Sequence, residues 1–444
     1  MRTFIWFEVK KRVRQAKTWG LIILLLIVSL LVIKNYNLQD KFVYVNYGKD
    51  FKSLSKNPYI DDELKNLRNK ENYKVAKYSY GVIYKTGEEA EIALQKKDMK
   101  EFYRAVTFGH LLYAKSNAEH EGTLREISFR NMTKDIWKNV SNGVDYDSVS
   151  FKVMNINFSR NFYFDFLTCA KYFYSLYEHN LKDSNTYQMD SMAFCYHYLN
   201  KIVPILLAVL ILIIMFDSIN EEHSKGSLKL ILTQPFSRKR YLLAKIIVGV
   251  MHTIFVVVIP MIGIVCVMGI GDFFKNYNYP VLYLRRSFTR FFSIHNNLEY
   301  DLKHFGVNKY YGFSLTSYSP KGSQDGISNR ITILPLYQFL LLSSLILLFM
   351  IIFYVVLNTL ISCIFKSKII SFAIAGLITI VGMILSNPLI SSDSYNLSPF
   401  SMNNPVRILS GTYNVTALTA MIVLFASSLV LFIVNVLYFR KKNL

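Results

Sequence analysis

Six apolar runs, each long enough or nearly long enough to cross a lipid bilayer as a helix, constrain the fold of this chain. An α-helix rises about 1.5 Å per residue, so about 20 apolar residues cross a hydrocarbon core about 30 Å thick. Hydrophobic residues make up 52% of the 444 positions and charged residues only 18%, which is low for a soluble protein. The sequence therefore predicts an α-helical membrane protein with six transmembrane helices. The runs cover residues 18–34, 199–217, 242–270, 333–360, 368–388 and 415–439.

Clusters of Lys and Arg beside these runs predict how the chain lies in the membrane. Basic residues that flank spans are retained in the cytoplasm, and six spans place all the clusters on one face. We therefore expect a multi-pass protein of the cell membrane with its N- and C-termini in the cytoplasm. The long segments 35–198 and 271–332 then lie outside. The clusters are residues 2–17, the loop 217–245, Lys366 with Lys368, and residues 440–442.

The first outer segment and the N-terminus each predict a folded element. Apolar residues lie among cations in residues 1–17, a pattern typical of an amphipathic interfacial helix whose cations face anionic lipid. Residues 35–198 are enough for a domain of ordinary size. Alternation of apolar and polar residues in 42–47 predicts a strand, whereas 88–118 and 160–177 predict helices. We expect a large mixed α/β extracytoplasmic domain between transmembrane helices one and two.

Two further segments separate spans on the outer side. Residues 271–332 contain several Pro and Gly turn signals and form a second extracytoplasmic insertion. Residues 389–414 are too long for a hairpin and too polar for a span, and prolines interrupt them. Irregular backbone at membrane depth is tolerated where protein buries it. We expect residues 389–414 to form an outer re-entrant segment.

The sequence carries no motif for bond chemistry. The net charge of +21 comes largely from the basic clusters of the inner face, which argues against a nucleic-acid partner. The four cysteines lack metal-binding spacing, and Cys169 and Cys195 are either a pair or two free thiols. Residues 109–116 match the spacing of a phosphate loop, but Ala114 replaces a glycine that phosphate wrapping requires. We expect no catalytic residue, no metal site and no cofactor in this chain.

Polar residues inside the predicted spans leave two interpretations open. His252 lies in the third span and is either a packed side chain or a member of a proton relay. Asn358 and Asn435 lie in the fourth and sixth spans and either join helices or bind ions.

A polar island, residues 217–245, separates the second and third spans. Its basic residues place it on the cytoplasmic side, where ATP is found. It contains a short amphipathic helix candidate, 227–234, which follows Gly226 and ends before Pro235. We expect residues 218–241 to form a cytoplasmic coupling loop with a helix that receives a push from another protein.

The same island closely resembles the first cytoplasmic loop of type-two ABC exporter permeases, the membrane subunits of ATP-binding-cassette transporters. The N-terminal interfacial helix, the six spans and the broken segment before the sixth span are similar to that family as well. The outer domain, 35–198, carries no motif of the family. The motif in the loop consists of Glu221-Glu222, Gly226-Ser227-Leu228, Leu230-Ile231-Leu232, Pro235, Ser237-Arg238, Leu243 and Lys245.

The resemblance implies partners and roles for the loop. A cytoplasmic ABC ATPase dimer would hold the loop helix in a cleft and would bind ATP and Mg, and a second permease copy or a sister permease would complete the transporter. Glu222 would pair with a cation of the ATPase. Arg238 would pair with lipid phosphate or an ATPase carboxylate, or it would simply mark the inner face. The implied ATPase-coupling residues are Glu221, Glu222, Gly226, Ser227, Leu228, Lys229, Ile231, Leu232, Pro235 and Arg238.

The resemblance also implies a function: an ATP-driven exporter that moves a hydrophobic or amphipathic substrate out of the cell or membrane. The leading expectation is a peptide such as a bacteriocin or toxin. Aromatic residues in 160–177 either form a surface for such a peptide or make the domain core. Two alternatives are a self-immunity transporter that removes an antimicrobial peptide, and an ATPase-independent membrane receptor or scaffold.

Overall fold

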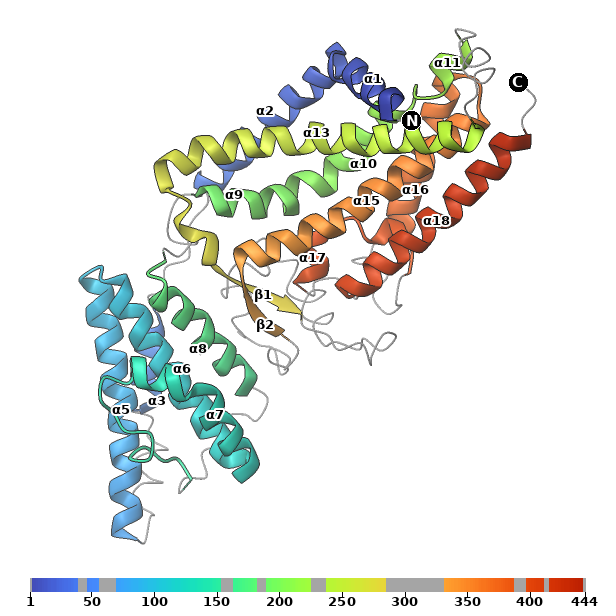
Figure 1. Ribbon diagram of the computed structural model, residues 1–444. Coiled ribbons are helices and arrows are strands. Elements are labelled where there is room, and N and C mark those ends of the chain that lie inside the picture. Colours follow the sequence, from blue (N-terminus) through green and yellow to red (C-terminus); the bar gives the residue numbers. More distant parts are fainter. Residues whose placement is uncertain are drawn as a thin grey trace.

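The structure is a computed structural model, and helices dominate the residues that it describes. The two elements at the N-terminus are α1 (Arg2–Val13) and α2 (Ala16–Leu38), which meet at a sharp elbow (Figure 1). The described residues are 2–38, 46–55, 69–152, 163–181, 189–224, 237–284, 331–386, 397–410 and 415–441.

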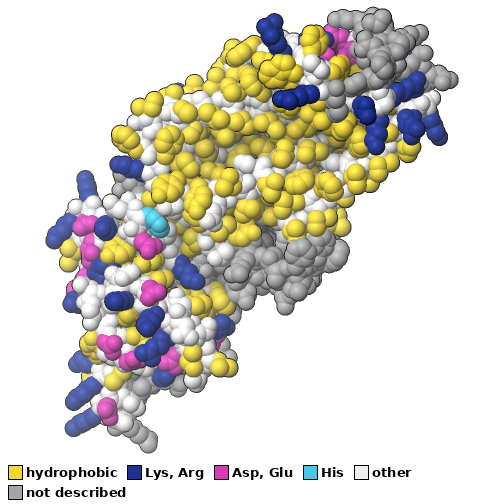
Figure 2. Space-filling model, viewed as in Figure 1, with side chains coloured by type: hydrophobic (Ala, Val, Ile, Leu, Met, Phe, Trp, Pro, Cys, Tyr) yellow, Lys and Arg dark blue, Asp and Glu magenta, His cyan; other side chains and the backbone are white. Residues whose placement is uncertain are grey.

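Among these residues, 6 helices are long and apolar enough to cross a membrane, which confirms the prediction of an α-helical membrane protein. They form an elongated bundle whose outer surface is a wide apolar band (Figures 1 and 2). The second of them is a composite of α9 (Ser191–His197), a π-helical turn η2 (Tyr198–Ile202) and α10 (Val203–Met215), followed by α11 (Asn220–Ser224). The other five are α2, α13 (Arg238–Asp272), α15 (Leu336–Ile364), α16 (Lys368–Leu385) and α18 (Ala417–Lys441).

A glycine brings three of these helices into close contact. At Gly249 of α13, an added Cβ would lie 2.6 Å from Met215 Sδ and 2.9 Å from Val355 Cγ1. The backbone of α13 therefore approaches α10 and α15 closely at this level. Between helices in lipid there is little hydrophobic driving force, so small residues that allow this approach strengthen packing by dispersion.

The segment between α2 and the second span folds into a helical domain. It consists of α3 (Asn46–Ser55), α5 (Lys70–Gln95), α6 (Met99–Glu121), α7 (Thr123–Val140) and α8 (Tyr163–Glu178). The expectation of a mixed α/β domain is corrected here: the described residues of 46–181 contain helices and no strand. Of the alternating stretch 42–47, residues 42–45 lie outside the described residues and the last two begin α3. Side-chain alternation over so few residues is overridden by packing of α3 on its neighbours.

Helix α6 is the centre of this domain, and the phosphate-loop spacing falls inside it. Residues 109–116 are helical and buried, so their backbone N–H groups are used within the helix. Gly109 has a packing role instead, because an added Cβ would lie 2.5 Å from the Phe51 ring. The next residue, His110, is fully enclosed. Its Nδ1 lies 2.8 Å from the Val106 carbonyl oxygen, and burial lowers its pKa to about 4.

Aromatic rings surround that histidine and fill the domain core. Ring centroids within 6.2 Å of the His110 centroid come from two neighbouring helices: Tyr47 and Phe51 of α3, and Phe166 and Phe173 of α8. Tyr172 and Phe173 are fully buried, whereas Tyr174 and Tyr177 are half-buried. The buried rings of 160–177 thus belong to the core, as one of the two interpretations proposed.

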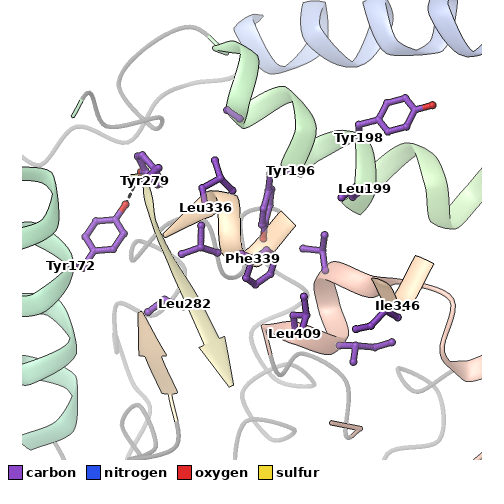
Figure 3. Packing of buried hydrophobic residues seen from close by; sticks show 14 of the residues in the cluster. Tyr172, Tyr196, Tyr198, Leu199, Tyr279, Leu282, Leu336, Phe339, Ile346 and Leu409 are labelled. Carbon is purple, nitrogen blue, oxygen red and sulfur yellow. Dashed lines mark hydrogen bonds between the residues drawn. The ribbon is translucent and has the colours of Figure 1, made fainter. Parts of the chain in front are cut away.

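A two-stranded antiparallel ribbon joins the helical domain to the bundle. Strands β1 (Pro280–Leu284) and β2 (Ile331–Pro335) pair, and β2 leads directly into α15. A short 3-10 helix, η3 (Lys275–Asn278), precedes β1. The Tyr172 and Tyr279 hydroxyls are 2.6 Å apart and connect α8 to the start of the ribbon (Figure 3). The second insertion, 271–332, lies mainly outside the described residues.

The described part of the connector before α18 packs into the bundle. It contains η6 (Pro399–Ser401) and α17 (Pro405–Leu409). Phe400 packs edge-to-face on Phe353, and an added Cβ at Gly382 would lie 2.7 Å from the Phe400 ring. Met402, Val406, Ile408 and Leu409 are buried. The segment expected to be re-entrant is therefore held between helices of the bundle in its described part.

Candidate coupling site

The polar island is attached to the bundle through the surface helix α1, whose orientation is unexpected. Glu8 and Arg12 are buried against the bundle, whereas Trp6 and Phe7 are 67% and 64% exposed. A surface helix of a soluble protein would face its apolar side inward. Here the apolar rings point away from the protein, as suits a helix that lies beside lipid, where Trp is favoured at the interface. The inward side of α1 carries charge, and that charge needs partners.

A buried ion cluster supplies the partners. Lys245 Nζ of α13 lies 2.9 Å from Glu8 Oε2 and also bonds a carboxylate oxygen of Glu222 at the end of the second span. The Tyr241 hydroxyl donates to the other oxygen of Glu222. The side chains of Lys245, Glu8 and Glu222 are 2%, 7% and 9% exposed. One ammonium group thus joins α1, α13 and the chain that enters the loop.

Further polar contacts fix the elbow between α1 and α2. Arg12 donates to the Ile214 carbonyl oxygen at 3.3 Å, and Lys17 pairs with Asp217 at 2.7 Å, so α1 and the start of α2 both bind the end of α10. Thr18 Oγ1 lies 2.9 Å from His252 Nε2. One ion pair, Lys17 with Asp217, and two hydrogen bonds, made by Arg12 and Thr18, therefore hold the elbow against the neighbouring spans.

An apolar cluster, which we call the foot, lies next to these charges. Its buried members come from the second span, α13, α15 and α18: Ile219, Tyr241, Leu242, Cys363 and Phe439. Phe439 stacks on Tyr241 with ring centroids 5.9 Å apart, and Phe4 of α1 packs against the same ring. The foot gathers the ends of five elements within one packed unit.

Two side chains at the roots of the loop bind the free carbonyl groups at helix ends. Before the loop, the Asn220 amide nitrogen lies 2.7 Å from the carbonyl oxygens of both Ser362 and Phe365, in the amide orientation that satisfies these groups. After the loop, Arg238 Nη1 donates to the Phe439 and Arg440 carbonyl oxygens at 3.3 and 3.0 Å. The last carbonyl groups of a helix have no partner within it. Each root of the loop thus holds the end of another span, α15 or α18.

The structure places three of the ten predicted coupling residues in this site. Glu221 lines the crevice between α1 and the second span. Glu222 was expected to pair with a cation of an ATPase, and in the structure Lys245 and Tyr241 bind its carboxylate inside the protein. Arg238 likewise binds the end of α18 rather than only marking a face. The other seven lie outside the described residues: Gly226, Ser227, Leu228, Lys229, Ile231, Leu232 and Pro235.

Sequence reasoning named Lys245 only as part of the loop motif and did not single out Glu8 or the pairing of the two. Glu8 was a lone acid among cations, and Lys245 lies near the start of an otherwise apolar run. An ionisable residue at the edge of a span is costly unless it is paired, so Lys245 was a signal that a carboxylate partner exists. The sequence could not say which carboxylate, because Glu8 and Lys245 are 237 residues apart.

Among the described residues, two of the three polar residues singled out within the spans, His252 and Asn358, make a side-chain hydrogen bond, whereas the Asn435 side chain is buried without one. His252 is bound to Thr18, and Asn358 donates to the Tyr354 carbonyl oxygen of its own helix at 2.8 Å. No disulfide joins Cys169 and Cys195. Among the described residues, no group of three or more His, Cys, Asp or Glu side chains is arranged to hold a metal ion.

This architecture defines a class: a polytopic helical membrane protein whose polar loop is rooted in the ends of its spans and in a surface helix. A family model described as ABC-2 family transporter protein matches residues 2–285, which include α1, the helical domain, the polar island and the first three spans. The chain belongs to this family and is a multi-pass membrane component of an ABC transporter. Comparison with curated proteins and with solved structures found no match.

Proposed function

We propose that this chain is the permease subunit of an ATP-driven exporter and that the loop 218–241 receives the motion of a cytoplasmic ABC ATPase dimer. The partner binds ATP and Mg, and a second permease copy or a sister permease completes the transporter. The observation that carries this proposal is the anchoring of the loop. Both of its roots hold the ends of other spans, and the Lys245 cluster ties it to α1.

Anchoring of this kind allows the loop to transmit a displacement to the spans. A force applied to a loop with loose roots is absorbed by backbone rotation, whereas a loop bonded to packed helices moves them as rigid bodies. A displacement of residues 218–241 therefore acts at once on α1, α13, α15 and α18. Buried cores transmit strain because they are close-packed. The site has the connections that convert closure of an ATPase dimer into rearrangement of spans.

The distribution of charge supports placing this end of the bundle in the cytoplasm. Basic side chains gather beside α1 and at the ends of α13 and α18, and the apolar band separates them from the helical domain (Figure 2). Lys and Arg beside spans favour the cytoplasmic side. With this orientation the N- and C-termini are cytoplasmic, and the helical domain and ribbon are outside.

The substrate we propose is hydrophobic or amphipathic, with a peptide such as a bacteriocin or toxin as the leading class. The helical domain rests on the ribbon that leads into α15, so a molecule leaving the bundle at this end meets it. Half-buried rings of α8, among them Tyr174 and Tyr177, offer aromatic surface to such a molecule. Removal of an antimicrobial peptide from the membrane would use the same surface in self-protection.

Co-purification tests the proposal. We expect an affinity-tagged chain, expressed from its own genomic neighbourhood, to bring down an ATPase with Walker motifs. Leu228→Asp with Ile231→Asp should abolish this association, because two carboxylates cannot be buried unpaired in a docking cleft. Leu124→Asp is the matched control, since Leu124 is 87% exposed on α7. Absence of any ATPase from the wild-type preparation would favour a receptor or scaffold, and equal ATPase recovery from all variants would refute docking through the loop.

A further inference from the structure

The second span is interrupted in the half of the bundle far from the foot. In η2, the Val203 N–H donates to the Tyr198 carbonyl oxygen, five residues back instead of four. The next residue, Pro204, has no N–H, so the carbonyl of Asn200 loses the donor that an α-helix would supply. Single π-turns within helices are rare and are found frequently at functional sites.

A residue of the connector before α18 occupies this break. Asn404 Nδ2 donates to the Asn200 carbonyl oxygen at 3.0 Å and lies equally close to Asn200 Oδ1. The Asn404 side chain is buried, and its Oδ1 accepts from the Arg407 N–H at 3.1 Å, which caps α17. One amide thus starts α17 and fills the position that Pro204 leaves open.

The break is also connected to α13. The Tyr198 hydroxyl donates to the Val257 carbonyl oxygen at 2.7 Å, three residues before Pro260, which lies inside α13. Tyr198 is fully buried and points to the opposite side of its helix from Tyr196, which packs toward Phe339 (Figure 3). Two proline-containing spans and the connector therefore meet at η2. Prolines are the commonest places where long helices bend.

We propose that Asn404 is a positioning residue that acts as a latch: it holds α17 in the break of the second span and keeps this end of the bundle closed. The inference rests on the proposed function for the force that opens the latch. When α17 withdraws, the Asn200 carbonyl loses the Asn404 donor, and Pro204 cannot supply the N–H that an α-helix would place there. Water that enters between α17 and the second span then satisfies it, so opening and hydration occur together.

Cys195 allows the latch to be tested in the whole chain. It is buried in α9, one turn before η2, and can be kept as the single thiol after replacement of Cys169, Cys266 and Cys363 by Ala. Asn404→Asp retains the oxygen that caps α17 and removes the donor to Asn200. We expect maleimide to label Cys195 about tenfold faster in this variant, in line with the loss of a buried hydrogen bond.

Asn403→Asp is the matched control, because it adds the same charge one residue earlier. An unchanged Cys195 labelling rate in Asn404→Asp, or an equal increase in Asn403→Asp, would overturn the latch. A second arm does not depend on how the Asp variant folds. Asn200→Cys with Asn404→Cys should form a disulfide readily in the resting protein and several-fold less with ATP and vanadate in the complex with the ATPase.

The two arms separate failure of the latch from failure of the proposed function. Equal disulfide yield in every nucleotide state, with the ATPase present, would overturn opening at Asn404. If no ATPase co-purifies, the proposed function fails, while the Cys195 labelling of the isolated chain still decides whether Asn404 closes this end.

Discussion

Replacing Lys245 by Met tests whether the buried ion cluster holds the foot together. The substitution keeps most of the side-chain volume but removes the one cation bonded to both Glu8 and Glu222, which are almost fully buried. Breaking a buried ion pair by removing one partner costs about 3–5 kcal/mol, because the remaining charge is left without compensation. At about 1.4 kcal/mol per factor of ten, the population in which the foot is open rises between about a hundredfold and a few thousandfold.

The native thiol of Cys363 reports this opening, since it is fully buried in the same cluster as Tyr241 and Phe439. With the other cysteines replaced by Ala, we expect the maleimide labelling rate of Cys363 in Lys245→Met to rise by the same factor as the open population. Lys239→Met, which removes an exposed Lys from the same helix, should change the rate by no more than about twofold. Adding Glu8→Gln and Glu222→Gln to Lys245→Met should restore most of the protection. A rate for Lys245→Met within about threefold of the parent would refute a structural role for the cluster.

Two further predictions concern the helical domain and the bundle. The pKa of His110 is lowered to about 4 from 6.5, so between these values the unfolded domain binds the proton more tightly and stability falls as the pH is lowered. We expect the free energy of unfolding of the domain to fall by about 3 kcal/mol over this window, and to fall by less in His110→Phe. Denaturation followed by Trp137 emission, with the other tryptophans replaced, measures this free energy. Equal pH slopes for the parent and His110→Phe would contradict the prediction. Gly249→Val should destabilise the bundle by about 1–3 kcal/mol, because the added Cβ would meet Met215. Gly263→Ala is the control: it lies on the same helix, has open space around the added Cβ and should be neutral. Equal melting temperatures of the two variants would contradict close packing at Gly249.

Much of the membrane architecture was predictable from local sequence. Length and apolarity alone specify six membrane-crossing helices, because a bilayer admits no backbone polar group without an internal partner. The island around Gly226 was sufficient to indicate the transporter family. The strand expected in 42–47 was wrong in its described part because six residues of alternation are compatible with a helix once α3 finds a surface to pack on.

The assembly of the site was decided only by the tertiary structure. Lys245 meets Glu8 across 237 residues, and Asn404 meets Asn200 across 204, so neither pairing leaves a periodic signal in the chain. The sequence by itself determined which segments enter the membrane, because burial of apolar surface depends on composition over about 20 residues. Which buried charge faces which partner depends on how the helices cross, and that is fixed by packing between segments far apart in the chain.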